Sequence, residues 1–214
     1  LKEDLLLRKA INHAIDREKM MKFLRKNIGY PAKSGLVPNG LNDNFYANRY
    51  FKNIDLASKY LNEYKQINNV ENITINLTTD AQYLDVLEFI QSELKSLNIN
   101  LKINITPPSI LRQGKATGKF DVFRASWIAD YANPENYFSL FYSKNHTPFG
   151  PNYTFFTNKE YDSLYEQTLI IKDKEQLNKI YMRMEEIISE YSPIVPLYYD
   201  CLLYTSPSPR DSMT

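Results

Sequence analysis

The most distinctive part of the chain is residues 120–134, which read FDVFRASWIADYANP. A predicted strand there carries Arg124 and Trp127 and runs into a loop that holds Asp130. A carboxylate just past a strand end lies where an open α/β sheet usually presents its ligand contacts. Asp130 could bind an ammonium group and Arg124 a carboxylate, with Trp127 and Tyr131 as flat apolar walls between them. The segment therefore predicts a binding site for a zwitterion.

A purely structural interpretation of the same residues competes with this one. Arg124 and Asp130 could pair with each other or cap nearby backbone groups, and Trp127 could belong to the hydrophobic core. The residues alone do not exclude this simpler interpretation.

Other chemistry has little support in the sequence. There is no Gly-rich phosphate loop, dinucleotide fingerprint or nucleophile elbow. His13 falls on a predicted helix and His146 in a polar loop, and neither has the neighbours of a metal site or a catalytic triad. Glu185 and Glu186 are adjacent on a predicted helix, where neighbouring side chains point apart, so we expect them on a solvated face. The sequence gives no positive support for an enzyme, and we expect neither a metal nor a cofactor.

The composition of the chain is that of an ordinary globular protein with a surplus of aromatic residues. Lys and Arg total 26 and Asp and Glu total 25, so the net charge of +1 gives no sign of a nucleic-acid partner or an anionic membrane surface. No apolar run approaches the roughly 18 residues that a membrane-spanning helix needs. Aromatic residues make up 14% of the chain, which hints at an aromatic-lined binding surface.

Elements that would position the candidate site follow from the hydrophobic pattern. Alternating apolar residues predict strands over residues 73–77 and 99–105, and an apolar stripe predicts a helix over residues 81–97 between them. A strand, a helix and a strand at this spacing form a βαβ unit with parallel strands. The pattern also predicts helices over residues 5–23, 55–64, 158–169 and 174–191, and strands over residues 120–127 and 194–199. This order indicates the α/β class, and a single three-layer lobe fits it.

Residues 127–134 resemble the Trp-x-x-Asp-Tyr-x-x-Pro stretch of the family 5 extracytoplasmic solute-binding proteins, the dipeptide- and oligopeptide-binding components of ABC transporters. Other matches follow in the family's order. Residues 8–17 are similar to its Arg-x-Ala-x-x-x-Ala-Ile-Asp-Arg helix, and residues 94–101 to its Leu-x-x-x-Gly-Ile-x-Leu turn. Asn98 replaces the usual Gly of that turn, a mild departure because Asn also tolerates the left-handed conformation. Further matches lie at residues 29–38, 161–164 and 193–198, so the resemblance covers about residues 5–200.

The resemblance implies a two-lobe fold that encloses its ligand between the lobes. This chain would be the second lobe of a class II periplasmic-binding-protein-like fold, with the N-terminal lobe missing. Residues 1–193 would form the ligand-binding lobe and residues 194–200 the start of the strand that returns to the first lobe. Residues 201–214 form a Ser/Pro-rich tail that resembles translated adapter sequence, so we expect it to be non-native, with a native tail as the alternative.

Function is implied by the resemblance as well. In peptide-binding members the aspartate matching Asp130 holds the peptide α-ammonium, and in oligopeptide-binding members an arginine at the place of Arg124 can meet the carboxylate. We therefore expect a monomer that delivers a di- or oligopeptide to the membrane permease of an ABC transporter and binds no nucleic acid. It would be periplasmic or a membrane-anchored lipoprotein, with its signal peptide outside this chain. The candidate ligand-binding residues are Asp130, Arg124, Trp127, Tyr131 and Asn133.

Three alternatives stay open. Relatives in the family bind metal chelates, haem, opines or oligosaccharides, although Asp130 together with Arg124 favours a zwitterionic peptide. The same lobe also serves as the ligand-sensing domain of some transcriptional regulators, which carry an N-terminal DNA-binding helix-turn-helix. An enzyme is the least favoured, because no pair of nucleophile and base is visible.

Overall fold

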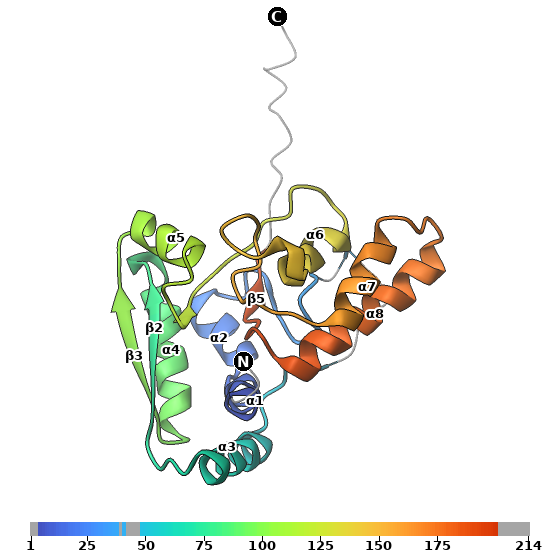
Figure 1. Ribbon diagram of the computed structural model, residues 1–214. Helices are drawn as coiled ribbons and strands as arrows, with labels where there is room; N and C mark the ends of the chain where they lie inside the picture. The colour runs from blue at the N-terminus through green and yellow to red at the C-terminus, as the bar shows by residue number, and fades with distance from the viewer. Residues whose placement is uncertain (1–3, 39, 42–47, 201–214) are drawn as a thin grey trace, which may run out of the picture.

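The computed structural model describes residues 4–38, 40–41 and 48–200 (Figure 1). Its helices are α1 Leu5–Ala14, α2 Arg17–Leu24, α3 Ile54–Asn68, α4 Leu84–Lys95, α5 Pro108–Ala116, α6 Pro134–Phe138, α7 Lys159–Thr168 and α8 Lys174–Tyr191. Its strands are β1 Tyr30–Pro31, β2 Ile73–Thr79, β3 Ile99–Ile105, β4 Val122–Phe123 and β5 Tyr198–Tyr199. Three short 3₁₀ helices are η1 Ala81–Tyr83, η2 Ser139–Phe141 and η3 Ser143–Asn145.

The predicted βαβ unit is confirmed. β2 and β3 are parallel, with Ile73 opposite Ile99, and α4 forms the crossover between them. β4 joins the other edge of β2, also in parallel, which gives the strand order β3-β2-β4. The mixture of helices and parallel strands confirms the α/β class.

One face of the sheet packs against the hydrophobic core, whereas the other face is exposed along most of its length, with Thr78 as a buried exception. At the start of β2 and β3 the side chains of Ile73, Ile75, Ile99 and Leu101 are buried, and further along Leu77 and Ile103 are half-buried. The polar residues between them, such as Asn76 and Lys102, are exposed. α4 packs along the buried face, and within the described residues Figure 1 shows no helix that lies along the other face. The expectation of three layers is therefore wrong for this sheet. The physical reason is in the sequence, since strands with polar residues at every second position have only one face to bury.

Two hydrophobic clusters take the place of a single core. The first is formed by α1 to α4 with β2 and β3, and the second by η2, α6, α7 and α8 with Val37 and Phe156. In Figure 1 the elements of the first cluster lie beside those of the second, and β5 lies between the sheet and α8.

A buried arginine at the start of α2 connects the first cluster to the C-terminal end of the described chain. The guanidinium of Arg17 donates to the carbonyl oxygens of Pro196 (2.6 Å) and Asn12 (2.9 Å) and to the side-chain oxygen of Asn12 (3.0 Å). Burial lowers the pKa of Arg17 to about 10, so the group stays charged at neutral pH. Arg8 likewise donates to the carbonyl of Ser192 at the end of α8. The residues that resemble the family's Arg-x-Ala-x-x-x-Ala-Ile-Asp-Arg helix therefore hold distant parts of the chain together.

Three regions differ from the predicted elements in extent. The helix predicted over residues 5–23 is two helices, because Ile15 is extended and the Asp16 side chain accepts from the Lys19 amide (2.9 Å) to begin α2. The strand predicted over residues 120–127 is reduced to β4, followed by one more ladder hydrogen bond from the Arg124 amide to the Thr78 carbonyl (3.0 Å). The strand predicted over residues 194–199 is reduced to β5, which pairs antiparallel with β1.

Glu185 corrects the expectation of a solvated acidic face on α8. Its side chain is fully buried, while Glu186 is exposed, as residues that point apart on a helix must be. The Glu185 carboxylate accepts hydrogen bonds from the amides of Leu36 (2.9 Å) and Val37 (3.0 Å). Burial is the main cause that raises the pKa of Glu185 to about 7. This carboxylate fixes the loop of residues 35–37 against α8.

We expect Gly35→Ala to destabilise the protein by roughly 2–4 kcal/mol. A Cβ on Gly35 would lie 2.3 Å from the Glu185 Oε2 atom, so the buried carboxylate would have to leave its two amide donors. Urea unfolding measures the loss of stability. In a Glu185→Ala background the same glycine change should cost less, because the obstructing carboxylate is gone; equal costs in both backgrounds would contradict this account.

Candidate functional site

The candidate site lies on the segment of residues 124–133, which leads from the sheet to α6 and thus from the first cluster to the second (Figure 1). Asp130 lies in this segment with its side chain exposed. Among the described residues no hydrogen bond or ion pair to its carboxylate is formed. The acidic group is therefore available to a ligand.

Arg124 does not form an ion pair with Asp130, one of the two arrangements that the structural interpretation offered. Its guanidinium stacks on the ring of Tyr83 in η1, with the Cζ atom 3.1 Å from the ring centroid. One N–H donates to the hydroxyl of Ser126 (3.3 Å). Stacking uses the flat face of a guanidinium and leaves its in-plane N–H groups able to donate. Arg124 is thus held in place by an aromatic ring while it keeps hydrogen-bonding capacity.

The indole of Trp127 is half-buried and belongs to neither hydrophobic cluster of the described chain. Its Nε1–H donates to the side-chain oxygen of Asn136 on α6 (2.7 Å). Trp127 therefore connects the segment to α6, and the alternative that places it in the core is not what the structure shows.

Tyr131 and Asn133 both contact the first turn of α6. Tyr131 is 52% exposed, and its hydroxyl donates to the Glu135 carboxylate. The side-chain oxygen of Asn133 caps α6 by accepting from the Glu135 amide (2.9 Å), and it also accepts from the Tyr181 hydroxyl (3.2 Å). The oxygen of Asn133 is therefore already occupied by two donors in this structure.

Three residues around the segment were missed by sequence reasoning. Glu135 accepts hydrogen bonds from Tyr131 and from Tyr165 of α7, and Tyr181 of α8 reaches Asn133. The start of α6 could have been found, because Asn-Pro-Glu is a typical helix N-terminus with a capping Asn and Pro in the first turn. The partners on α7 and α8 carry no local signal.

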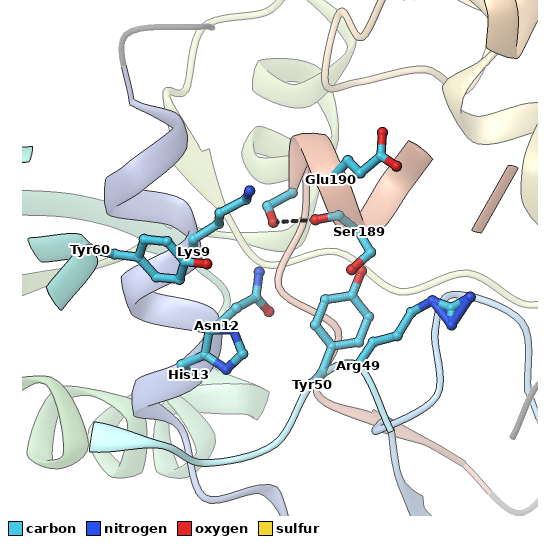
Figure 2. A pocket seen from close by; sticks show the side chains of 9 residues that line it. Lys9, Asn12, His13, Arg49, Tyr50, Tyr60, Ser189 and Glu190 are labelled. Carbon is cyan, nitrogen blue, oxygen red and sulfur yellow. Dashed lines mark hydrogen bonds between the residues drawn. The ribbon is translucent and has the colours of Figure 1, made fainter. Parts of the chain in front are cut away.

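A separate cavity of about 220 Å³ lies between α1, α3 and the C-terminal end of α8 (Figure 2). None of the five candidate ligand-binding residues lines it. Figure 2 shows the Arg49 guanidinium and the Glu190 carboxylate extending away from the space beside His13 and Tyr50. Its volume is below the roughly 300–1,000 Å³ of typical small-molecule sites. The cavity is therefore a poor candidate for the ligand site.

His13 of α1 lines this cavity. It is half-buried, and its Nδ1 lies 3.1 Å from the Phe51 carbonyl oxygen. Burial lowers the pKa of His13, which favours the neutral imidazole at neutral pH. Within residues 4–38, 40–41 and 48–200 no group of three or more His, Cys, Asp and Glu side chains is arranged to hold a metal ion. No helix of that part is long and apolar enough to cross a membrane.

Comparisons with known proteins identify the family to which the chain is similar. Residues 3–149 match the family described as bacterial extracellular solute-binding proteins, family 5 Middle. The dipeptide-binding protein DppE of Bacillus subtilis (strain 168) is 27% identical over 203 residues, a match that covers 90% of this chain and 37% of that protein.

Solved structures give the same fold. The periplasmic binding protein DppA from Helicobacter pylori, in complex with the peptide STSA, matches with a TM-score of 0.82 at 23% identity, over 92% of this chain and 38% of its own. The dipeptide-binding protein from Pseudoalteromonas sp. SM9913, in complex with Met-Leu, matches with a TM-score of 0.79 at 26% identity, over 92% and 40%. The chain thus spans less than half the length of these relatives.

Proposed function

Because this chain belongs to the family 5 extracellular solute-binding proteins, we propose that it is the second lobe of a protein that captures di- or oligopeptides for an ABC transporter. The family consists of solute-binding proteins of transport systems, which are not enzymes, and its members act in the periplasm or elsewhere outside the cytoplasm. The peptide ligand and the permease partner are carried over from relatives that are named for peptide binding.

The observation that carries the proposal is the exposed, unpaired carboxylate of Asp130. In the proposed complex this carboxylate binds the α-ammonium group of the peptide. Closure of two lobes removes the ammonium from water, which is costly unless an opposite charge compensates it. A charge-assisted hydrogen bond contributes about 1.5–3 kcal/mol. Because Asp130 has no hydrogen-bond or ion-pair partner among the described residues, it can supply this interaction without breaking another one there.

Arg124 supplies the opposite charge in the same proposal. Its in-plane N–H groups bind the peptide carboxylate, and Trp127 and Tyr131 flank the backbone between the two charged ends. Support comes from the absence of an Arg124–Asp130 ion pair among the described residues, which leaves both charges available to a zwitterion. A site with a carboxylate, aromatic walls and a guanidinium suits a peptide with two charged ends better than a neutral sugar.

The remaining parts of the proposal concern the whole protein. We propose that a first lobe closes over Asp130 and that residues 194–200 begin the strand that returns to it. We also propose that the whole protein carries a signal peptide or a lipid anchor and that it is a monomer. The proposed non-native tail, residues 201–214, lies outside the described residues.

Calorimetric titration of the complete binding protein with three forms of one peptide tests the proposal. The forms are trialanine, its N-acetylated derivative and its C-terminal amide. We expect acetylation to weaken binding about a hundredfold or more, because it removes the ammonium charge, and amidation to weaken binding less. Equal affinity for the free and the acetylated peptide would contradict the ammonium role. Stabilisation by an oligosaccharide or a metal chelate, with no response to any peptide, would favour the other ligand classes of this fold.

A further inference from the structure

The segment that carries Asp130 is long, exposed and without regular secondary structure. Hydrogen bonds nevertheless hold it in place on both sides of the aspartate. Residues 124–133 contain no helix or strand. Ordering a free segment costs about 1–2 kcal/mol per residue, and a binding site on a mobile segment would lose that free energy on binding. Contacts that order the segment beforehand therefore matter for affinity.

On the N-terminal side of Asp130, Trp127 is held by Asn136. On the C-terminal side the Asn133 amide donates to the Tyr131 carbonyl (2.9 Å), and the Asn133 side chain caps α6. These contacts close the segment onto the first turn of α6. The Asp130 carboxylate lies in the segment between these contacts and has no hydrogen-bond or ion-pair partner among the described residues.

Two tyrosines then fasten this turn to the second hydrophobic cluster. The Tyr165 hydroxyl of α7 donates to Glu135, and the Tyr181 hydroxyl of α8 donates to Asn133. Both rings are anchored in the cluster, since Tyr165 packs on Tyr142 (ring centroids 4.6 Å apart) and Tyr181 stacks on Phe138 (5.3 Å apart). Burial raises the pKa of Tyr181 to about 12, so its hydroxyl remains a donor at neutral pH.

We propose that Tyr165 and Tyr181, acting through Glu135 and Asn133, are positioning residues that hold Asp130 in place for the ligand ammonium group. The inference rests on the proposed function and adds to it the residues that preorganise the site. In this inference Asn133 is a positioning residue as well, because both hydrogen bonds to its side-chain oxygen come from protein donors. Preorganisation raises affinity by lowering the ordering cost of binding.

The test removes only the two hydroxyls, in a Tyr165→Phe, Tyr181→Phe double variant of the complete binding protein. Titration with trialanine and with N-acetyl-trialanine should show about a tenfold loss of affinity for the free peptide and little change for the acetylated one. Hydrogen exchange at the amides of residues 128–133 should become faster. The aromatic rings remain, so the fold should persist, and the thermal unfolding midpoint verifies this.

A matched control is Tyr142→Phe. The Tyr142 hydroxyl also donates to a glutamate, Glu166 (2.5 Å), but this pair does not touch the Asp130 segment. The control should change neither affinity nor exchange. Unchanged discrimination between the two peptides in the double variant would overturn the inference alone, as would an equal loss for both peptides. No discrimination in the wild-type protein would overturn the proposed function as well.

Discussion

Replacing Asp130 by asparagine should weaken the binding of free-amine peptides about a hundredfold or more while leaving the protein folded. The carboxylate is exposed and makes no hydrogen bond or ion pair with the described residues, so its neutralisation breaks no contact within the lobe. In the proposed closed complex the same change leaves an ammonium group out of water without a compensating charge. Calorimetry of the complete protein measures the affinity, and circular dichroism verifies the fold.

Asp121→Asn is the matched control for this variant. Asp121 is also exposed and lies just before β4, in the same stretch of chain. Each substitution removes one carboxylate, so the two variants have the same net charge. We expect this control to bind peptides as the wild-type protein does. N-acetylated peptides should bind equally to the wild-type protein and to Asp130→Asn, because they carry no ammonium group. A hundredfold loss in both aspartate variants would point to the general electrostatic field instead of a specific contact.

Local signals explain why several elements were predicted closely. Helix α8 has the bounds that were predicted, residues 174–191, since Asp173 caps its first turn and Pro193 prevents its continuation. Strands β2 and β3 follow from their alternating apolar residues, and the turn between α4 and β3 follows from Asn98 at a positive φ of 56°. In these parts the sequence neighbours of each residue decide its conformation.

Distant contacts explain the parts that were not predicted. Arg17 donates to a carbonyl 179 residues away, and Glu185 accepts from an amide 149 residues away. No local pattern distinguishes a glutamate that faces such amides from one that faces water. The division into two hydrophobic clusters has the same origin, because an apolar stripe on a helix does not say which neighbour it will contact.

The candidate site combines both situations. Asp130 and Arg124 could be singled out because one segment holds them next to a predicted strand end. Tyr165 and Tyr181 could not, because they lie 30 and 48 residues from their partners and read as ordinary apolar positions of their helices. The ligand contacts proposed here are thus local in the sequence, whereas the groups that hold them in place come from elsewhere in the fold.

The buried Glu185 should make the stability of the lobe depend on pH in a direction opposite to that of most carboxylates. Its pKa is raised from 4.5 to about 7 in the folded chain, so between these values the folded state binds more protons than the unfolded state. The free energy of unfolding therefore decreases as the pH rises from about 4.5 to 7 and then levels off. A shift of this size corresponds to roughly 3 kcal/mol over that range.

Urea unfolding of the wild-type chain and of Glu185→Gln at a series of pH values isolates this contribution. The amide cannot ionise, so the difference in unfolding free energy, wild type minus variant, should be largest below about pH 4.5 and fall by roughly 3 kcal/mol by pH 7. Glu186→Gln, on the exposed side of the same helix, controls for the substitution itself. A difference that stays constant with pH would mean that Glu185 ionises in the folded lobe as freely as in the unfolded chain, in spite of its complete burial.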